Sequence, residues 1–355
     1  MRPIQELELQ RPATLAEAAK LLAASGARAI AGGTDLVPNM RRGLVDAERL
    51  VDLGALPGFA AIEAQPDGGW RIGAGVTLAT LARHAALAAA LPALAQAASQ
   101  VAGPAHRSAA TLGGNLCQDT RCIFYNQSEW WRASNGYCLK RPPRAEPLAR
   151  PAPRGGSSSP AEPDLLERGG AICHVAPQGK RCHAAYEGDV APALIALGAE
   201  VEVVSAGSTS RRPLASIYRD DGAAHLTLSS SELVVAALVP APARGSASGY
   251  RKARARAAMD FPLAGVGVAL RIEGGVLAAL RVGISGTNSH PVALEGTDAL
   301  LGKPVDDATL AALGKLVSKQ VSPMRSTVTQ SNHRRLVAVV TAQRLVRDLA
   351  QGDQA

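Results

Sequence analysis

The sequence predicts an α+β protein built from three domains, the second of which carries a cysteine-bearing insert. Three observations support this fold class. The chain has 355 residues, which is too long for one ordinary domain. Hydrophobic residues make up 47% of it and charged residues 19%, so it can bury sizeable cores. Patterns typical of short strands and helices alternate along it, and turn-forming residues cluster near 57–68. We expect the domains to span residues 1–58, 59–225 and 226–355.

The first domain is predicted to be a small α/β unit. Thr14 and Glu17 form a capping box, in which a hydroxyl and a carboxylate accept hydrogen bonds from free amides at the start of a helix. Residues 28–31 follow as a short buried strand. Gly32-Gly33-Thr34-Asp35 then turns the chain into a further helix, and residues 50–53 are expected to form another strand.

The second domain begins with a helix that Thr77 caps, followed by Ala-rich helices that Pro92 interrupts. Residues 111–115, Thr-Leu-Gly-Gly-Asn, form a glycine-rich turn, after which the insert runs over about 117–186. Its residues 141–170 are rich in Pro, Arg, Gly and Ser. Such a composition cannot bury enough apolar surface to order itself, so we expect a mobile loop there.

The third domain is predicted to combine a sheet with helices. Its expected strands are residues 233–239, 266–272 and 278–284, and its expected helices are residues 306–319 and 331–350. The turn Glu273-Gly-Gly275 joins the last two strands as a hairpin.

Two glycine-rich segments have the chemistry of a phosphate-binding loop. The adjacent glycines in Gly32-Gly33 and Gly113-Gly114 let the backbone approach a phosphate closely and point successive amides into one concavity. A dinucleotide such as FAD has a pyrophosphate between two large ring systems, so two such segments from neighbouring domains would suit it. Each segment alone is also compatible with an ordinary tight turn, and the G-x-G-x-x-G fingerprint is absent.

Four of the five cysteines have the number needed for one tetrahedral metal ion or one iron–sulfur cluster: Cys122, Cys138, Cys173 and Cys182. A cytoplasmic chain keeps its thiols reduced, which favours metal binding or buried thiols over disulfides. The spacing, with 15, 34 and 8 residues between successive members, does not match the paired C-x₂-C of zinc ribbons. Spacing alone therefore leaves reduced thiols in an ordinary surface insertion as an alternative.

The composition around these cysteines favours a shielded centre. Five of the chain's eleven aromatic residues lie between Cys122 and Cys138, where they can shelter a cluster from water. His174 and His183 each stand beside a cysteine and keep a mixed Cys/His zinc site open as well.

The remaining features restrict the function classes. A net charge of +8 is compatible with anionic cofactors or acidic partners, and a solvated basic surface explains it equally well. The basic run Arg251–Arg256 lacks the stacking aromatics of a nucleic-acid site, so we expect no nucleic acid as a partner. A solvated basic face is one interpretation of this run. The alternative for Lys252 is a position beside a flavin, where a lysine stabilises negative charge on the reduced ring. No Ser-His-Asp arrangement, carboxylate pair or P-loop is present, so no catalytic residue is predicted.

Hydropathy predicts a cytoplasmic protein without a membrane span. The start of the chain has no apolar signal-peptide region. The longest apolar stretch, residues 85–98, is short and is broken by Pro92, as expected for a pair of soluble helices.

Five segments occur in the same order as in the FAD-binding subunit of the xanthine oxidase family of molybdenum enzymes, which the chain resembles over nearly its whole length. They are Ala31–Leu36, Ile72–Thr77, Thr111–Asn115, Asp189–Ala193 and Tyr250–Pro262. The resemblance implies two α/β FAD-binding domains followed by a C-terminal domain of sheet and helices. It implies FAD contacts from Ala29, Ile30, Ala31, Gly32, Gly33, Thr34, Asp35, Leu36, Val101, Thr111, Gly113, Gly114, Asn115, Gln118, Asp189 and Lys252.

The insert narrows the resemblance. Thr111–Cys122, followed by Trp-Arg and further cysteines, is similar to the β subunit of 4-hydroxybenzoyl-CoA reductase, which carries a [4Fe–4S] cluster at this place. The similarity implies that the cluster ligands are Cys122, Cys138, Cys173 and Cys182, and that Cys117 is a packing residue. The link from Cys138 to Cys173 is longer than in that family, and a longer loop costs little because closure entropy rises only with the logarithm of length.

The resemblance implies an electron-transfer subunit that performs no substrate chemistry itself. Partner subunits would supply a molybdenum-pterin and two [2Fe–2S] clusters, within a dimer of heterotrimers. The complex would remove the phenolic hydroxyl of 4-hydroxybenzoyl-CoA with electrons from a ferredoxin-like donor. Two alternatives stay open: the FAD subunit of another molybdenum hydroxylase that passes electrons outward, and a flavin-free docking module whose insert binds zinc.

Overall fold

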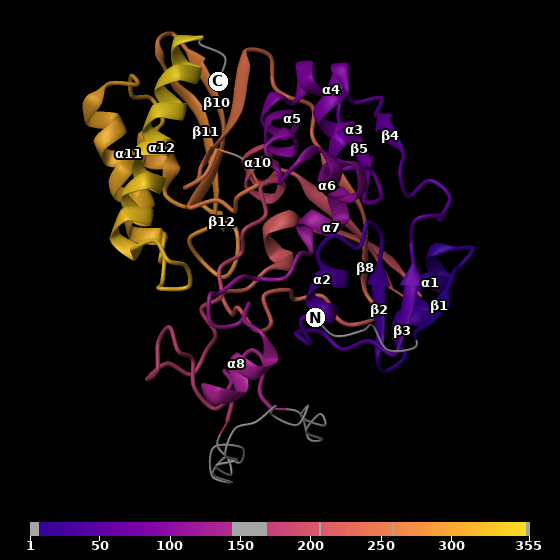
Figure 1. Ribbon diagram of the computed structural model, residues 1–355. Helices are drawn as coiled ribbons and strands as arrows, with labels where there is room; N and C mark the ends of the chain where they lie inside the picture. Colours follow the sequence, from indigo (N-terminus) through magenta and orange to yellow (C-terminus); the bar gives the residue numbers. More distant parts are fainter. Residues whose placement is uncertain (1–6, 144–168, 206, 258, 353–355) are drawn as a thin grey trace.

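Within the described residues, three β-sheets organise the fold, each with its own helices (Figure 1). The computed structural model describes residues 7–143, 169–205, 207–257 and 259–352. The predicted mobile loop over 141–170 lies almost entirely outside these ranges. No helix within them is both long enough and apolar enough to cross a membrane.

The N-terminal sheet is parallel, with its strands in the order β1-β3-β2. Its elements are β1 (Glu8–Gln10), α1 (Leu15–Leu22), β2 (Ala27–Ile30), α2 (Leu36–Arg41) and β3 (Arg49–Asp52). The predicted capping box is present: Thr14 Oγ1 accepts a hydrogen bond from the Glu17 amide at 3.1 Å, and the Glu17 carboxylate accepts one from the backbone just before Thr14. The strand predicted over 28–31 also forms. It is not buried, because β2 lies at an edge of the sheet and exposes Arg28 and Ala29.

The middle sheet has five antiparallel strands in the order β4-β5-β8-β6-β7. They are β4 (Ile62–Ala64), β5 (Trp70–Gly73), β6 (Glu200–Val204), β7 (Thr209–Pro213) and β8 (Leu233–Val239). The helices of this part of the chain are α3 (Leu78–Arg83), α4 (Ala85–Ala90), α5 (Pro92–Ser99), α6 (Pro104–Ala109), α7 (Leu112–Leu116), α8 (Glu129–Ser134), α10 (Val190–Ala196) and η1 (Leu214–Ile217).

Strand β8 corrects the sequence-based assignment of residues 233–239 to the third domain. It lies between β5 and β6, at the centre of the middle sheet. Six of its seven residues are buried, which fits a central strand that is covered on both faces. We propose that the boundary between the second and third domains falls after β8, within residues 240–245.

The C-terminal sheet is antiparallel, in the order β12-β11-β10-β9. Its elements are β9 (Ser246–Ala253), β10 (Ala264–Glu273), β11 (Val276–Ser285), β12 (Val292–Ala293), η2 (Thr297–Leu300), α11 (Asp307–Gln320) and α12 (Ser331–Gln351). The predicted hairpin joins β10 to β11. Gly274 and Gly275 at its turn have φ of 56° and 82°, a conformation that favours glycine.

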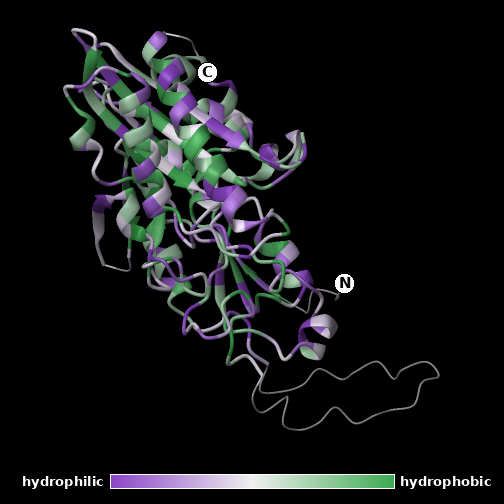
Figure 2. Ribbon diagram, turned by 90° about the vertical axis from the view of Figure 1, so that its left-hand side faces the viewer, coloured by the Kyte–Doolittle hydropathy of each residue, from purple (hydrophilic) through white to green (hydrophobic). Residues whose placement is uncertain are grey.

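Helices cover both faces of this sheet. α11 and α12 pack on one face, and the apolar strands run beneath them (Figure 2). α10 from the middle domain packs on the other face, where a Cβ added to Gly267 or Gly283 would collide with the carbonyl oxygen of Pro192. These two glycines therefore allow the middle and C-terminal domains to pack closely.

The two ends of the insert are held side by side by hydrogen bonds. Arg121 and Ala185 exchange backbone hydrogen bonds of 2.7 Å in each direction. Beyond this bridge the chain carries α8 and projects from the body of the molecule (Figure 1).

Candidate functional site

The two glycine-rich segments that were predicted to bind a phosphate lie against each other. Gly32 packs so closely on the chain at the end of α6 that an added Cβ would overlap the carbonyl oxygen of Ala109. The second segment begins two residues later. Gly33 has φ of 67°, a left-handed conformation that favours glycine. The structure thus brings residues 29–36 and 111–115 together, although they come from different domains.

The second segment is the start of a helix rather than a free turn. Thr111 caps α7, and its Oγ1 accepts a hydrogen bond from the amide of Gly114 at 3.2 Å. Asn115 is buried, and its Oδ1 accepts a bond from the amide of Val190 at 3.1 Å, which ties α7 to α10. A Cβ on Gly113 would collide with the chain that follows β5, whereas Gly114 is exposed. Gly113 therefore permits close packing, and Gly114 faces outward.

Three further predicted contacts, Val101, Asp189 and Lys252, meet where α5, α10 and β9 converge. The carboxylate of Asp189 is buried and accepts hydrogen bonds from Lys252 Nζ at 2.9 Å and from the Tyr250 hydroxyl at 2.5 Å. Lys252 Nζ also donates to the carbonyl of Gln100 at 3.2 Å, directly before Val101. Burial raises the pKa of Asp189, and the positive charge of Lys252 opposes that rise.

A cation that the sequence did not single out holds the turn after α5. Arg107 Nη1 donates to the carbonyl oxygens of Val101 at 2.8 Å and of Ala102 at 3.1 Å. Ala102 has φ of 40°, which is uncommon for a residue with a side chain. Arg107 therefore stabilises the backbone that presents Val101.

The carboxylate of Asp35 is bonded to the insert. It accepts hydrogen bonds from the amide of Asp119 at 2.8 Å, from the guanidinium of Arg121, and from Asn39 Nδ2 at 3.3 Å. Asp35 stands at the N-cap position of α2, and its side chain makes no capping bond to that helix. Burial raises the pKa of Asp35, with Arg121 as the main opposing charge. Asp35 thus fastens the insert to the N-terminal domain.

The other residues predicted to contact FAD lie on the same segments or directly beside them. Ala29, Ile30, Ala31, Thr34 and Leu36 belong to the stretch from β2 to the start of α2 that carries Gly32 and Gly33. Gln118 stands between α7 and the insert, and its Nε2 is buried without a hydrogen-bond partner in the described part of the chain. An unpaired buried amide can donate to a bound ligand. Adjacent glycine-rich backbone and a free donor fit the phosphates and rings of FAD.

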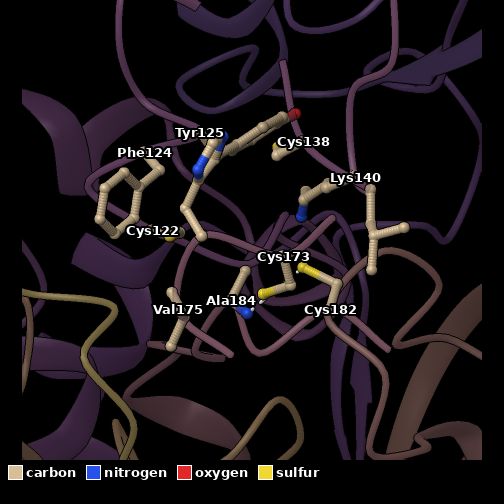
Figure 3. A pocket seen from close by; sticks show the side chains of 11 residues that line it. Cys122, Phe124, Tyr125, Cys138, Lys140, Cys173, Val175, Cys182 and Ala184 are labelled. Carbon is tan, nitrogen blue, oxygen red and sulfur yellow. Dashed lines mark hydrogen bonds between the residues drawn. The ribbon is translucent and has the colours of Figure 1, made fainter. Parts of the chain in front are cut away.

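The four cysteines predicted as ligands line one pocket of the insert: Cys122, Cys138, Cys173 and Cys182 (Figure 3). All are buried free thiols. Burial raises the pKa of the Cys122 thiol to about 11 and that of the Cys182 thiol to about 12. Phe124 and Tyr125 line the same pocket, as the aromatic composition of the insert suggested. Thiols that are far apart in the sequence therefore converge.

These thiols do not by themselves form an ion site. As the side chains stand, no group of three or more His, Cys, Asp or Glu residues in the described ranges could hold a metal ion. His174 lines the pocket, where its ring stacks on Phe124 at 5.3 Å and bonds to the carbonyl of Tyr137. His183 is not among the residues that line the pocket. Cys117 packs against the core of the middle domain.

A buried lysine completes the wall of the thiol pocket. The Lys140 side chain is 5% exposed, and its Nζ donates to the Asp119 carboxylate at 2.6 Å and to the carbonyl of Gly222 at 2.8 Å. The same ammonium lies 4.6 Å from the ring centroid of Tyr125. Because the amide of Asp119 binds Asp35, a continuous polar chain joins the pocket to the first glycine-rich segment.

Glu187 is a further residue that sequence reasoning missed. It is buried, and burial raises its pKa to about 7, against the opposing charges of Arg334, Arg121 and Lys252. For the buried charges around Asp35 and Glu187, the sequence signal was the charged pair Asp119 and Arg121 inside the Thr111–Cys122 motif. Glu187 itself stands in no motif.

Comparison with known proteins gives two matches to family models. Residues 5–242 match the FAD binding domain in molybdopterin dehydrogenase, and residues 248–349 match the CO dehydrogenase flavoprotein C-terminal domain. These matches and the arrangement of the sheets confirm the predicted fold class.

Individual proteins are similar along most of the chain. The aldehyde oxidoreductase FAD-binding subunit PaoB of Escherichia coli (strain K12) is 32% identical over 282 residues, which are 78% of this chain and 80% of PaoB. The carbon monoxide dehydrogenase medium chain of Afipia carboxidovorans is 25% identical over 96% of this chain and 95% of its own. Among solved structures, reconstituted CO dehydrogenase from Oligotropha carboxidovorans superimposes with a TM-score of 0.75 at 22% identity, over 99% of both chains.

Proposed function

This chain belongs to the family of FAD-binding electron-transfer subunits of the molybdenum hydroxylases, and from that premise we propose that it carries electrons through two centres of its own. One is FAD at the paired glycine-rich segments, and the other is a [4Fe–4S] cluster at the four thiols. Substrate chemistry takes place on a partner subunit. The observation that carries the proposal is that all four predicted thiols line one pocket. Hydrogen bonds from Lys140 to Asp119 and from Asp119 to Asp35 join this pocket to the first glycine-rich segment.

The FAD site uses residues of both glycine-rich segments. We propose that the backbone of 32–34 and the exposed Gly114 face the pyrophosphate, and that Gln118 Nε2 donates to the cofactor. Asp189 and Lys252 would hold the ribose and flavin side, since both are already fixed by buried hydrogen bonds. FAD supplies the exchange of one or two electrons.

The donor set has the type and the number of ligands that a [4Fe–4S] cluster requires. The thiolates of a [4Fe–4S] cluster bind four different iron atoms, so they stand further apart than the ligands of one zinc ion. The four buried thiols that line one pocket supply the four ligands that such a cluster needs. The aromatic walls supplied by Phe124 and Tyr125 would limit the access of water to a cluster.

Partner subunits would complete the electron path. We propose a molybdenum-pterin catalytic subunit and a [2Fe–2S] subunit, assembled as a dimer of heterotrimers, with a ferredoxin-like protein as the external carrier. Reductive dehydroxylation of 4-hydroxybenzoyl-CoA is the first candidate reaction, because the thiol insert resembles that reductase. Oxidation of an aldehyde, with electrons passing outward, is the second candidate, and the 32% identity to the aldehyde oxidoreductase subunit favours it.

Cofactor analysis of the anaerobically purified chain tests the two centres. We expect bound FAD together with about four irons and four acid-labile sulfides per chain. Cys138→Ser should lose iron and sulfide while keeping FAD, whereas Cys117→Ser is the matched control that should keep both. Zinc without sulfide would refute the cluster, and absence of flavin would refute the electron-transfer role.

The reaction is tested on the complex co-expressed with its partners. Turnover of 4-hydroxybenzoyl-CoA with a reduced low-potential donor supports the first candidate. If the complex instead oxidises aldehydes with an electron acceptor and does not reduce 4-hydroxybenzoyl-CoA, the second candidate reaction replaces the first.

A further inference from the structure

We propose that Lys140 sets the reduction potential of the centre at the four thiols, through a buried ion pair that is oriented with its positive end toward the pocket. This inference rests on the proposed [4Fe–4S] site. It assigns to the chain a residue that tunes the centre without being one of its ligands.

The orientation of the pair follows from its contacts. Lys140 is itself part of the pocket wall, whereas Asp119 is not. In Figure 3 the nitrogen end of Lys140 is directed toward the side of the pocket where Cys173 and Cys182 lie, and Asp119, which does not line the pocket, accepts a hydrogen bond from that Nζ at 2.6 Å. The Lys140 ammonium therefore acts on the pocket as a positive charge. The Asp119 carboxylate is further from the thiols and offsets this charge only in part.

Surrounding groups hold the ammonium in place. Nζ also donates to Gly222 O at 2.8 Å and to Thr120 O at 3.2 Å, so its donors meet acceptors on several sides. Gly222 in turn donates its amide to the carbonyl of Cys182 at 2.9 Å. The same loop thus bonds both the lysine and one of the proposed ligands, which limits how far Nζ can move away from the pocket.

Burial decides how strongly this charge acts. The Lys140 side chain is 5% exposed and that of Asp119 is 23% exposed, so water screens the pair far less than it screens a surface lysine. Reduction adds one negative charge to a cluster that already carries four thiolates. A nearby fixed positive charge stabilises the reduced form, and charge near a cluster is one of the factors that set its potential.

The chain offers a matched control. Lys180 lies two residues before Cys182, just as Lys140 lies two residues after Cys138, but Lys180 is exposed. Lys140→Gln and Lys180→Gln therefore remove the same charge at the same sequence distance from a proposed ligand. Asp119→Asn changes the other member of the pair and has the opposite electrostatic sign.

The experiment is an anaerobic redox titration of the full-length chain, with the cluster followed by electron paramagnetic resonance and with iron and sulfide measured for every variant. We expect Lys140→Gln to lower the midpoint potential by more than a tenfold change in the one-electron equilibrium constant, which is 59 mV. Asp119→Asn should raise it. Lys180→Gln should leave it within a twofold change, and Lys140→Arg should restore most of the wild-type value.

The outcomes separate this inference from the function on which it rests. A wild-type chain without iron and sulfide removes the cluster and the role of Lys140 together. If the wild type has the cluster, but Lys140→Gln and Asp119→Asn shift its potential in the same direction, the inference alone is overturned. Removing opposite charges should shift the potential in opposite directions, whereas a general loosening of the pocket would shift it the same way in both variants. Equal shifts in Lys140→Gln and Lys180→Gln overturn it as well. If Lys140→Gln fails to retain the cluster, an unchanged or lowered potential in Asp119→Asn is decisive against it.

Discussion

Arg121 donates a hydrogen bond to the carboxylate of Asp35 across 86 residues of sequence, and so joins the first residues of the insert to the loop after β2. The amide of Asp119 binds the other oxygen of the same carboxylate at 2.8 Å. Arg121 also stands 5.2 Å from the ring centroid of Phe261, which belongs to the C-terminal domain. One arginine therefore contacts elements from all three parts of the fold.

Removing this arginine should loosen the insert. In Arg121→Ala the partly buried carboxylate of Asp35 loses its charged partner, and the expected loss of stability is about 1–3 kcal/mol. Thermal unfolding followed by far-ultraviolet circular dichroism and by flavin release would measure it. Arg256→Ala removes an arginine from an exposed pair with Asp260 and serves as the control, which should change little. Equal effects of the two substitutions would show that the Arg121–Asp35 contact is not structural.

The close approach of the two glycine-rich segments should not tolerate a methyl group. Gly32→Ala places a Cβ on the carbonyl oxygen of Ala109, so the segments must separate. We expect at least a tenfold loss of FAD affinity in fluorescence titrations of the flavin-depleted protein. Gly207→Ala is the matched control, because nothing lies within 4 Å of its added Cβ. Unchanged affinity in Gly32→Ala would mean that the flavin does not depend on the contact between these segments.

Breaking the buried pair between Lys252 and Asp189 should be costly. Lys252→Met leaves the buried carboxylate of Asp189 without its bonded cation, and among the described residues the Tyr250 hydroxyl is the hydrogen-bond donor that remains to it. Removing one member of a buried ion pair costs about 3–5 kcal/mol. Urea unfolding would detect this loss, and the double variant Lys252→Met/Asp189→Asn should recover part of it, since the uncompensated charge is then gone. A double variant no more stable than Lys252→Met would contradict this account.

Glu187 should make stability depend on pH near neutrality. Its pKa in the folded protein is about 7, above the ordinary value of 4.5, so folding favours the protonated form. The penalty is absent below about pH 4, grows as the pH rises, and is complete above pH 7. One pKa unit corresponds to 1.36 kcal/mol, so the full penalty is on the order of 3 kcal/mol. The stability of Glu187→Gln relative to the wild type should therefore rise between pH 5 and pH 8 in urea titrations. A constant difference over this range would rule out the buried carboxyl as the cause.

Local patterns in the sequence were sufficient for several elements. Thr14 and Glu17 predicted the start of α1, Pro92 the break between α4 and α5, and Gly274-Gly275 the hairpin of the last sheet. Each of these depends on hydrogen bonds and backbone angles within a few residues, which sequence patterns describe directly. Strand β8 was assigned to the wrong sheet. Its apolar run indicates that both faces of the strand are covered, but it does not indicate which strands lie beside it.

The sequence by itself determined which chemical groups this protein has: two glycine-rich segments, four thiols in an insert, and the order of motifs that identifies the family. Only the tertiary structure decided how they are placed. It put Gly32 against Ala109, gathered the four cysteines in one pocket, and set Lys140 and Asp119 between that pocket and Asp35. The physical reason is that contacts between residues far apart in the sequence depend on how whole sheets and helices pack, and no local pattern encodes that packing.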